Sequence, residues 1–116
     1  MKQGAIVRAA FQQNDGRVKQ HPALVLATIE PFQDLLLCSI STQIWITEYE
    51  SFLNVKITEA HPDFPQTGLK YPSVFRLGML YTMSEKNIEG TLGTITDSLY
   101  EDFIHRIVQY LKDESL

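Results

Sequence analysis

The chain has 116 residues, 44% of them hydrophobic and 21% charged, with a formal net charge of −4 at pH 7. A chain of this length and composition fits one folded domain over residues 1–116 and excludes a disordered protein. The acidic balance argues against a general nucleic-acid binder, because affinity for phosphate comes from Lys and Arg.

The sequence predicts neither export nor membrane insertion. Its apolar runs fall short of the roughly 20 residues that span a bilayer, and Met1–Phe11 is too short and too interrupted by Arg8 for a signal peptide. The single cysteine, Cys38, cannot form an internal disulfide. We therefore expect a cytoplasmic protein with no membrane partner.

The N-terminal part predicts a strand followed by a loop. Apolar and polar residues alternate over Gly4–Gln12, which indicates a strand. Asn14-Asp15-Gly16 is a strong turn signal, since these residues tolerate left-handed backbone. We expect a polar loop over Asn14–His21, which carries the cations Arg17 and Lys19.

The next stretch predicts an antiparallel hairpin around which the chain is organised. Its strands are the apolar runs Ala23–Ile29 and Leu35–Ile40, separated by the breakers Pro31 and Asp34. Pro22 is expected to start the first strand, where its missing N–H costs no ladder bond.

Further strands are expected after the hairpin. Thr42–Glu50 is either a strand extension or a structured loop, and Phe52–Thr58 alternates as a half-buried strand does. His61–Pro72 is rich in proline and predicts a loop, and Ser73–Met83 predicts the next strand.

The C-terminal part predicts a short strand and one helix. Gly90–Thr96 reads as a strand in which Gly93 permits a bend or a close backbone approach. Asp97 or Ser98 is expected to cap the helix, and Ser98 with Glu101 matches a capping box. The apolar stripe of this helix consists of Leu99, Phe103, Ile107 and Leu111.

These elements together predict a mainly β fold. Several short strands with no helical crossovers, followed by one amphipathic helix, favour a small antiparallel barrel or a strongly twisted sheet with the helix as its cap.

A candidate site follows from the hairpin. The start of one antiparallel strand lies beside the end of the next, so His21 and the hydroxyls of Ser41 and Thr42 are expected at one end of the sheet. Arg17 and Lys19 precede His21 in the predicted loop. An imidazole, two cations and two hydroxyls would then converge.

Each of these residues also has a structural interpretation. His21 is either a general acid or base, since imidazole titrates near neutral pH, or an exposed residue before a proline. Arg76, isolated on an apolar strand, either binds phosphate or pairs with a carboxylate such as Asp34 or Glu59. The two hydroxyls are suited to phosphate but are also common at strand ends.

Other reactive or aromatic residues favour structural roles. Cys38 lies in an apolar run and is expected in the core. His61 and His105 lack the close spacing and the company of a metal site, so no metal is expected. Trp45 and Tyr49 either stack on the bases of a single-stranded nucleic acid or anchor the core or a dimer interface.

Several motifs occur along the chain in an order that resembles a known family. GAIVRAAF begins the chain, KQHPALVLA and LLLCSISTQ form the hairpin, and TGLKYPSVFRL, GTLGTIT and the final helix follow. Along essentially its whole length the chain resembles the MazF/PemK/Kid family of type II toxins. The resemblance implies an SH3-like antiparallel barrel of the MazF/PemK/CcdB type with a C-terminal helix, a homodimer, and a cognate antitoxin as partner.

The resemblance also implies an activity. Many members are endoribonucleases (mRNA interferases) that need no metal or other cofactor. They cut single-stranded RNA by attack of the 2′-hydroxyl on its own phosphodiester, leaving a 2′,3′-cyclic phosphate. The alternative is a catalytically degenerate or CcdB-like member that binds a protein, either an antitoxin or a topoisomerase. A third possibility is an SH3-like interaction module without a toxin role.

The family's functional residues are only partly present. His21 stands where members commonly have an arginine that stabilises the phosphate, and Ser41 where many have a threonine that holds it. Arg76 coincides with a catalytic arginine of the Kid-like branch, whose acidic residue two positions later is Gly78 here. By resemblance, His21, Arg76 and Ser41 are the catalytic candidates. The substrate-binding candidates are Arg17, Lys19 and Thr42.

Overall fold

The computed structural model describes residues 2–43 and 51–113. The interpretation of Trp45 and Tyr49, and of most of the stretch 42–50, lies outside the described residues. The elements are β1 (Ala5–Gln12), β2 (Val18–Ile29), β3 (Asp34–Ser41), β4 (Asn54–Ile57), α1 (Phe64–Thr67), β5 (Ser73–Ser84), η2 (Glu85–Asn87), β6 (Ile88–Thr94) and α2 (Asp97–Lys112).

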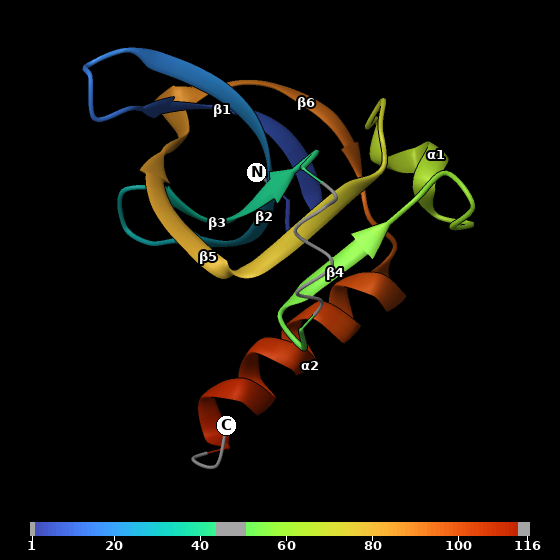
Figure 1. Cartoon of the computed structure of the whole chain (residues 1–116). Helices are drawn as coiled ribbons and strands as arrows, with labels where there is room; N and C mark the ends of the chain where they lie inside the picture. Colours follow the sequence, from blue (N-terminus) through green and yellow to red (C-terminus); the bar gives the residue numbers. More distant parts are fainter. Residues whose placement is uncertain (1, 44–50, 114–116) are drawn as a thin grey trace.

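One antiparallel sheet holds all six strands in the order β4-β5-β3-β2-β1-β6. The sheet curls on itself into a barrel-like ring, and α2 lies outside the ring (Figure 1). The predicted mainly β fold with a C-terminal helix is confirmed.

Irregularities in the ladders produce this curvature. Val25 pairs with Leu37 while Ala27 pairs with Leu36, so Leu26 is an extra residue in β2. In β5, residues 77–79 lie between the partners of two successive β3 residues. Extra residues of this kind bend a strand and increase its twist.

The curled sheet buries a different set of apolar residues on each face. The inner set fills the ring and consists of Ala5, Val7, Ala9, Ala23, Val25, Leu35 and Leu37. The outer set packs against α2 and includes Ile6, Leu24, Ile40, Ile57, Phe75, Leu77 and Phe103. The rings of Phe75 and Phe103 lie 5.3 Å apart and join the sheet to the helix.

Strand β2 begins earlier than the sequence indicates. The predicted polar loop over Asn14–His21 is wrong for its second half, because Val18 pairs with Gln12 of β1 and His21 pairs with Ala9. These residues are exposed or half-buried, and most are polar, so the sequence does not show the apolar alternation that would indicate a strand. Pro22 is therefore inside β2 and not at its start.

Two regions after the hairpin also differ from the predictions. Strand β4 covers only Asn54–Ile57 of the predicted Phe52–Thr58. The predicted loop His61–Pro72 contains the one-turn helix α1, in which Phe64 and Thr67 are buried. Burial of these two side chains explains why the proline-rich segment folds back on the sheet.

The predicted cap of α2 is wrong by one or two residues. Thr96 caps the helix: its Oγ1 accepts a hydrogen bond from the Leu99 N–H at 3.2 Å and donates one to Asp63 Oδ2 at 2.9 Å. The partnership with Asp63 is a tertiary contact, so a local sequence pattern does not show it. The Tyr100 hydroxyl donates to the Leu26 carbonyl at 2.6 Å and ties the first turn to β2.

The turn after α1 packs directly on β6. A side chain at Gly93 would overlap the backbone of Gln66 and Thr67, and one at Gly68, where φ is +71°, would overlap the Leu92 carbonyl. The predicted close approach at Gly93 is confirmed. Of the helices described, none is long and apolar enough to cross a membrane.

Candidate functional site

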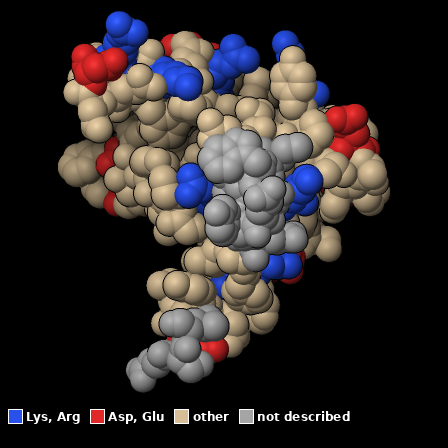
Figure 2. Space-filling model, in the orientation of Figure 1, with Lys and Arg blue, Asp and Glu red and all other residues tan. Residues whose placement is uncertain are grey.

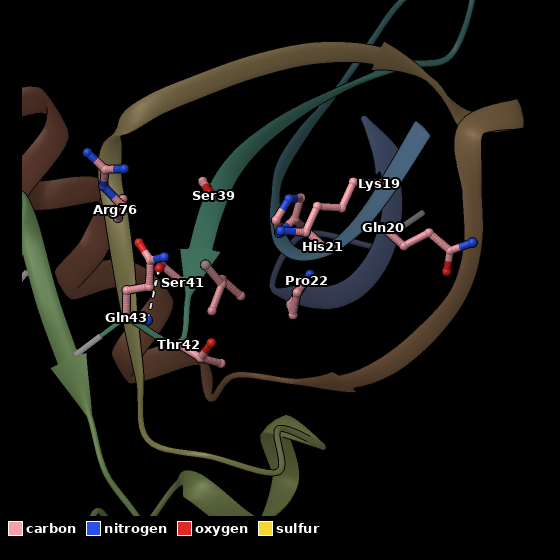
Figure 3. A pocket seen from close by; sticks show the side chains of 10 residues that line it. Lys19, Gln20, His21, Pro22, Ser39, Ser41, Thr42, Gln43 and Arg76 are labelled. Atoms are coloured by element: carbon pink, nitrogen blue, oxygen red, sulfur yellow. Dashed lines mark hydrogen bonds between the residues drawn. The ribbon is translucent and has the colours of Figure 1, made fainter. Parts of the chain in front are cut away.

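A cavity opens where strands β2 and β3 separate. Their ladder ends at the pair Ala23–Ser39, while β3 continues beside β5 as far as Ser41. The separation leaves a hollow of about 400 Å³. Figure 3 shows this cavity, which is lined by Lys19, Gln20, His21, Pro22, Ser39, Ile40, Ser41, Thr42, Gln43 and Arg76.

The register places the polar lining residues on the inner face of the sheet. Ala23 and Val25 of β2 point into the ring, so His21, two residues before Ala23, lies on the same face. Ser39 pairs with Ala23, and Arg76 pairs with Ser39. The cavity is therefore the mouth of the ring, where polar side chains replace the apolar ones that fill it.

The surroundings of His21 favour its neutral imidazole, which can accept a proton. Its ring lies 5.9 Å from that of Phe11, which in turn packs 4.8 Å from Tyr81. Partial burial lowers the pKa of His21 below 6.5, and the charge of Lys19 lowers this pKa further. Both effects favour the neutral imidazole.

Arg76 lines the cavity on the side opposite His21 and Lys19 (Figure 3). Its Nε is buried and has no hydrogen-bond partner among the described residues. Neither Asp34 nor Glu59, both within the described part of the chain, forms an ion pair with it. An unmet buried donor costs roughly 1–3 kcal/mol, and more when it carries charge.

The hydroxyls border the cavity at the end of β3. Ser41 Oγ accepts a hydrogen bond from the Gln43 N–H at 3.1 Å, which fixes the chain as it leaves the strand. The Ser41 O–H proton can still be donated to an oxygen in the cavity. Thr42 is exposed at the rim.

The predicted site residues meet here with one exception. Lys19, His21, Ser41 and Arg76 line the cavity together with Thr42. The side chain of Arg17 is 84% exposed, does not line the cavity, and forms an ion pair with Asp15 at 3.5 Å. A role for Arg17 in binding substrate stays a prediction.

Three polar lining residues were not singled out as site residues from the sequence. Gln20 and Gln43 resemble ordinary surface residues, and nothing in their spacing distinguishes them. Ser39 carries a usable signal, since it continues the alternation of Leu35 and Leu37 as the first polar residue on that face.

Other reactive groups contribute nothing to this site. Burial raises the pKa of the Cys38 thiol to about 12, so the thiol stays protonated. Within residues 2–43 and 51–113, His, Cys, Asp and Glu form no group of three or more that could hold a metal ion.

Charge favours an anionic ligand in the cavity. The lining includes Lys19 and Arg76 and no carboxylate among the described residues. Figure 2 shows Lys and Arg atoms near the middle of this face and along its top edge, and Asp and Glu atoms mainly toward its edges. The negative net charge is therefore unevenly distributed over the molecule.

The sequence comparison decides the family. Residues 2–111 match the family model described as "PemK-like, MazF-like toxin of type II toxin-antitoxin system". The chain belongs to this family. A sequence search among curated proteins gives no match.

Solved structures share the fold of this MazF-like toxin. One is described as "Endoribonuclease in complex with its cognate antitoxin from Mycobacterial species", with 13% identity, a TM-score of 0.68, and coverage of 96% of this chain and 94% of that chain. Another is the Mycobacterium tuberculosis toxin MazF-mt6, with 19% identity, a TM-score of 0.66, and coverage of 92% and 95%. At these identities the likeness shows the fold.

Proposed function

We propose that this MazF-like toxin is an endoribonuclease that cleaves single-stranded RNA without a metal. The observation that carries the proposal is the meeting of His21, Ser41 and Arg76 around one cavity that has cations and no described carboxylate in its lining. Transphosphorylation of a phosphodiester requires a group that accepts a proton and groups that bind the phosphate oxygens.

The substrate supplies its own nucleophile. The 2′-oxygen attacks the adjacent phosphorus, the bond from phosphorus to the 5′-oxygen breaks, and the products end in a 2′,3′-cyclic phosphate and a 5′-hydroxyl. Neutral His21 takes the proton of the 2′-hydroxyl, and the resulting imidazolium can return a proton to the departing 5′-oxygen. The lowered pKa of His21 favours the neutral imidazole that the first of these steps requires.

Arg76 stabilises the charge that grows on the phosphate oxygens. Arg76 lines the cavity, and its planar guanidinium can donate to two oxygens of the phosphorane. Ser41 donates its O–H to the same phosphate, while Lys19 and Thr42 bind the neighbouring backbone.

Two departures from the family leave the bidentate contact with phosphate to Arg76 and the acid–base chemistry to His21. His21 cannot give the bidentate grip of the arginine that members commonly have at this position. Gly78 stands in place of an acidic residue, and it borders an apolar groove beside Leu53 instead of the cavity. In this chain we therefore assign all acid–base chemistry to His21.

The test is RNA cleavage by the pure, antitoxin-free protein in the presence of EDTA. We expect a long mixed-sequence RNA to be cut, with 2′,3′-cyclic phosphate ends, and both His21→Ala and Arg76→Ala to cut it far more slowly. Lys112→Ala, at the exposed end of α2, is the matched control and should cut like wild type. Intact RNA after incubation with well-folded wild type would refute the proposal.

A specific observation favours partners as well. The apolar groove between β5 and α2 is lined by Leu53, Leu77, Gly78, Leu80, Ile107, Tyr110 and Leu111, and Leu111 is 76% exposed. We propose that protein contacts of the toxin, with an antitoxin or a second copy, use such apolar surface. Light scattering of wild type and Leu111→Asp would show whether a homodimer forms there. If growth arrest comes with intact RNA, the protein-binding alternative replaces the ribonuclease.

A further inference from the structure

A second cavity adjoins the candidate site on the far side of Pro22 and Thr42, which line both. It measures about 160 Å³. Its other lining residues are Arg8, Gly68, Leu69, Lys70, Tyr71, Ser73 and Leu92. The two cavities therefore share a border at Pro22 and Thr42.

The segment 68–73 that forms one wall is held firmly at both ends. Buried Thr67 donates through Oγ1 to the Phe64 carbonyl at 2.6 Å and accepts from the Leu69 N–H at 3.1 Å. At the other end, the Ser73 hydroxyl donates to the Tyr71 carbonyl at 2.8 Å. The backbone that carries Tyr71 is therefore fixed before any ligand binds.

Tyr71 is 64% exposed on this fixed segment. A large ring held in solvent on ordered backbone contributes little to the core. The same arrangement lowers the entropic cost of binding a flat partner, because little freedom remains to be lost. Stacking of a base on such a ring is a common way to bind single-stranded nucleic acid.

The charge of the second cavity matches that of the first. Arg8 is exposed on β1 opposite Pro22, and Lys70 precedes Tyr71. As in the first cavity, the described lining residues include no carboxylate. Two cations beside an exposed ring suit a phosphodiester backbone with an unstacked base.

We propose that the second cavity is a nucleotide subsite next to the scissile phosphate. Tyr71 stacks on the base, and Arg8 and Lys70 contact the flanking phosphates. This inference rests on the proposed function, since it assumes that the first cavity holds RNA.

Binding, measured apart from cleavage, tests the subsite. The probe is a fluorescent random-sequence RNA of about 14 nucleotides with 2′-O-methyl groups, which cannot be cut because its nucleophile is blocked. Anisotropy should show binding about tenfold weaker for Tyr71→Ala, from the loss of one stacked base, and within twofold of wild type for Tyr71→Phe. Phe32→Ala is the matched aromatic control, since Phe32 is 83% exposed in the turn between β2 and β3.

Salt dependence tests the two cations. Arg8→Gln and Lys70→Gln should each reduce the slope of log affinity against log salt by about 0.7, the value for one phosphate on a single strand. Lys112→Gln should leave the slope unchanged.

The outcomes separate the two proposals. Unchanged probe binding by Tyr71→Ala overturns the subsite, whether or not wild type cleaves RNA. Weaker binding by Tyr71→Ala with a wild type that binds but does not cleave supports the subsite and refutes only the ribonuclease.

Discussion

The two ends of the inner face of the sheet differ in chemistry although the same strands form both. Toward the middle of the ring, β2 and β3 present Ala23, Val25, Leu35 and Leu37, which are fully buried. Toward the mouth, His21 occupies the corresponding position of β2 and Ser39 that of β3. The difference teaches that the inward-facing positions of one strand supply first the core and then the site. The change from apolar to polar side chains takes place from one inward-facing position to the next, two residues away.

The largest effect should come from the buried end. We expect Leu37→Ala to lower the free energy of unfolding by about 2–5 kcal/mol, because it removes a fully buried side chain and leaves a cavity. Chemical denaturation measures the loss. Activity per folded molecule should stay near that of wild type, and a selective loss of activity would contradict the separation of core and site.

At the mouth of the ring we expect the opposite, a loss of activity with stability kept. Arg76→Ala should lower kcat/KM for RNA by about 100- to 1,000-fold, as loss of a preorganised donor to a developing oxyanion does. Its stability should be equal to or above that of wild type, because it loses a buried donor that has no partner among the described residues. Arg76→Lys keeps the charge but not the fork and should recover only part of the activity.

The pH dependence of His21 sharpens the comparison, because the His21 ring contacts Phe11, which packs against the inner apolar set. As a base, it should give activity that rises with pH and is half-maximal below 6.5. Lys19→Gln removes the second cause of the lowered pKa, so the acidic limb of the profile should move to higher pH. A profile that Lys19→Gln does not shift would argue against His21 as the base.

The lowered pKa of His21 also determines how the stability of the fold changes with pH. Since the folded pKa lies below the unfolded value, the unfolded chain binds more protons as pH falls from 6.5 through the folded pKa. The contribution of His21 to stability is therefore present above 6.5 and is lost in that window. His21→Gln should weaken this part of the pH dependence of unfolding.

Ser41 should give the smallest effect. Ser41→Ala removes one phosphate donor and the acceptor of the Gln43 N–H, so we expect roughly tenfold lower kcat/KM and about 0.5–1.5 kcal/mol lower stability. Ser41→Thr, which keeps the hydroxyl, should remain near wild type in both measurements. Equal losses in the two variants would mean that the shape of the side chain matters more than its hydroxyl.

The sequence could predict the hairpin and the meeting of His21 with Ser41, because antiparallel neighbours place the start of one strand beside the end of the next. It could not predict that Ser39 pairs with Arg76, since this depends on three extra residues in β5. The sequence also could not show that Arg17 would not line the cavity. The turn pairs that residue with Asp15, a local contact that spacing alone does not reveal.

The fold of α1 against β6 has a consequence for how the chain behaves in concentrated solution. Strands at the edge of a sheet can recruit other chains when they are long and regular. Here β4 has four residues, and β6 is interrupted by two register shifts and covered by the turn at Gly68. Among the described residues neither edge offers a long, flat template, so we expect the chain to have little tendency to polymerise through its sheet.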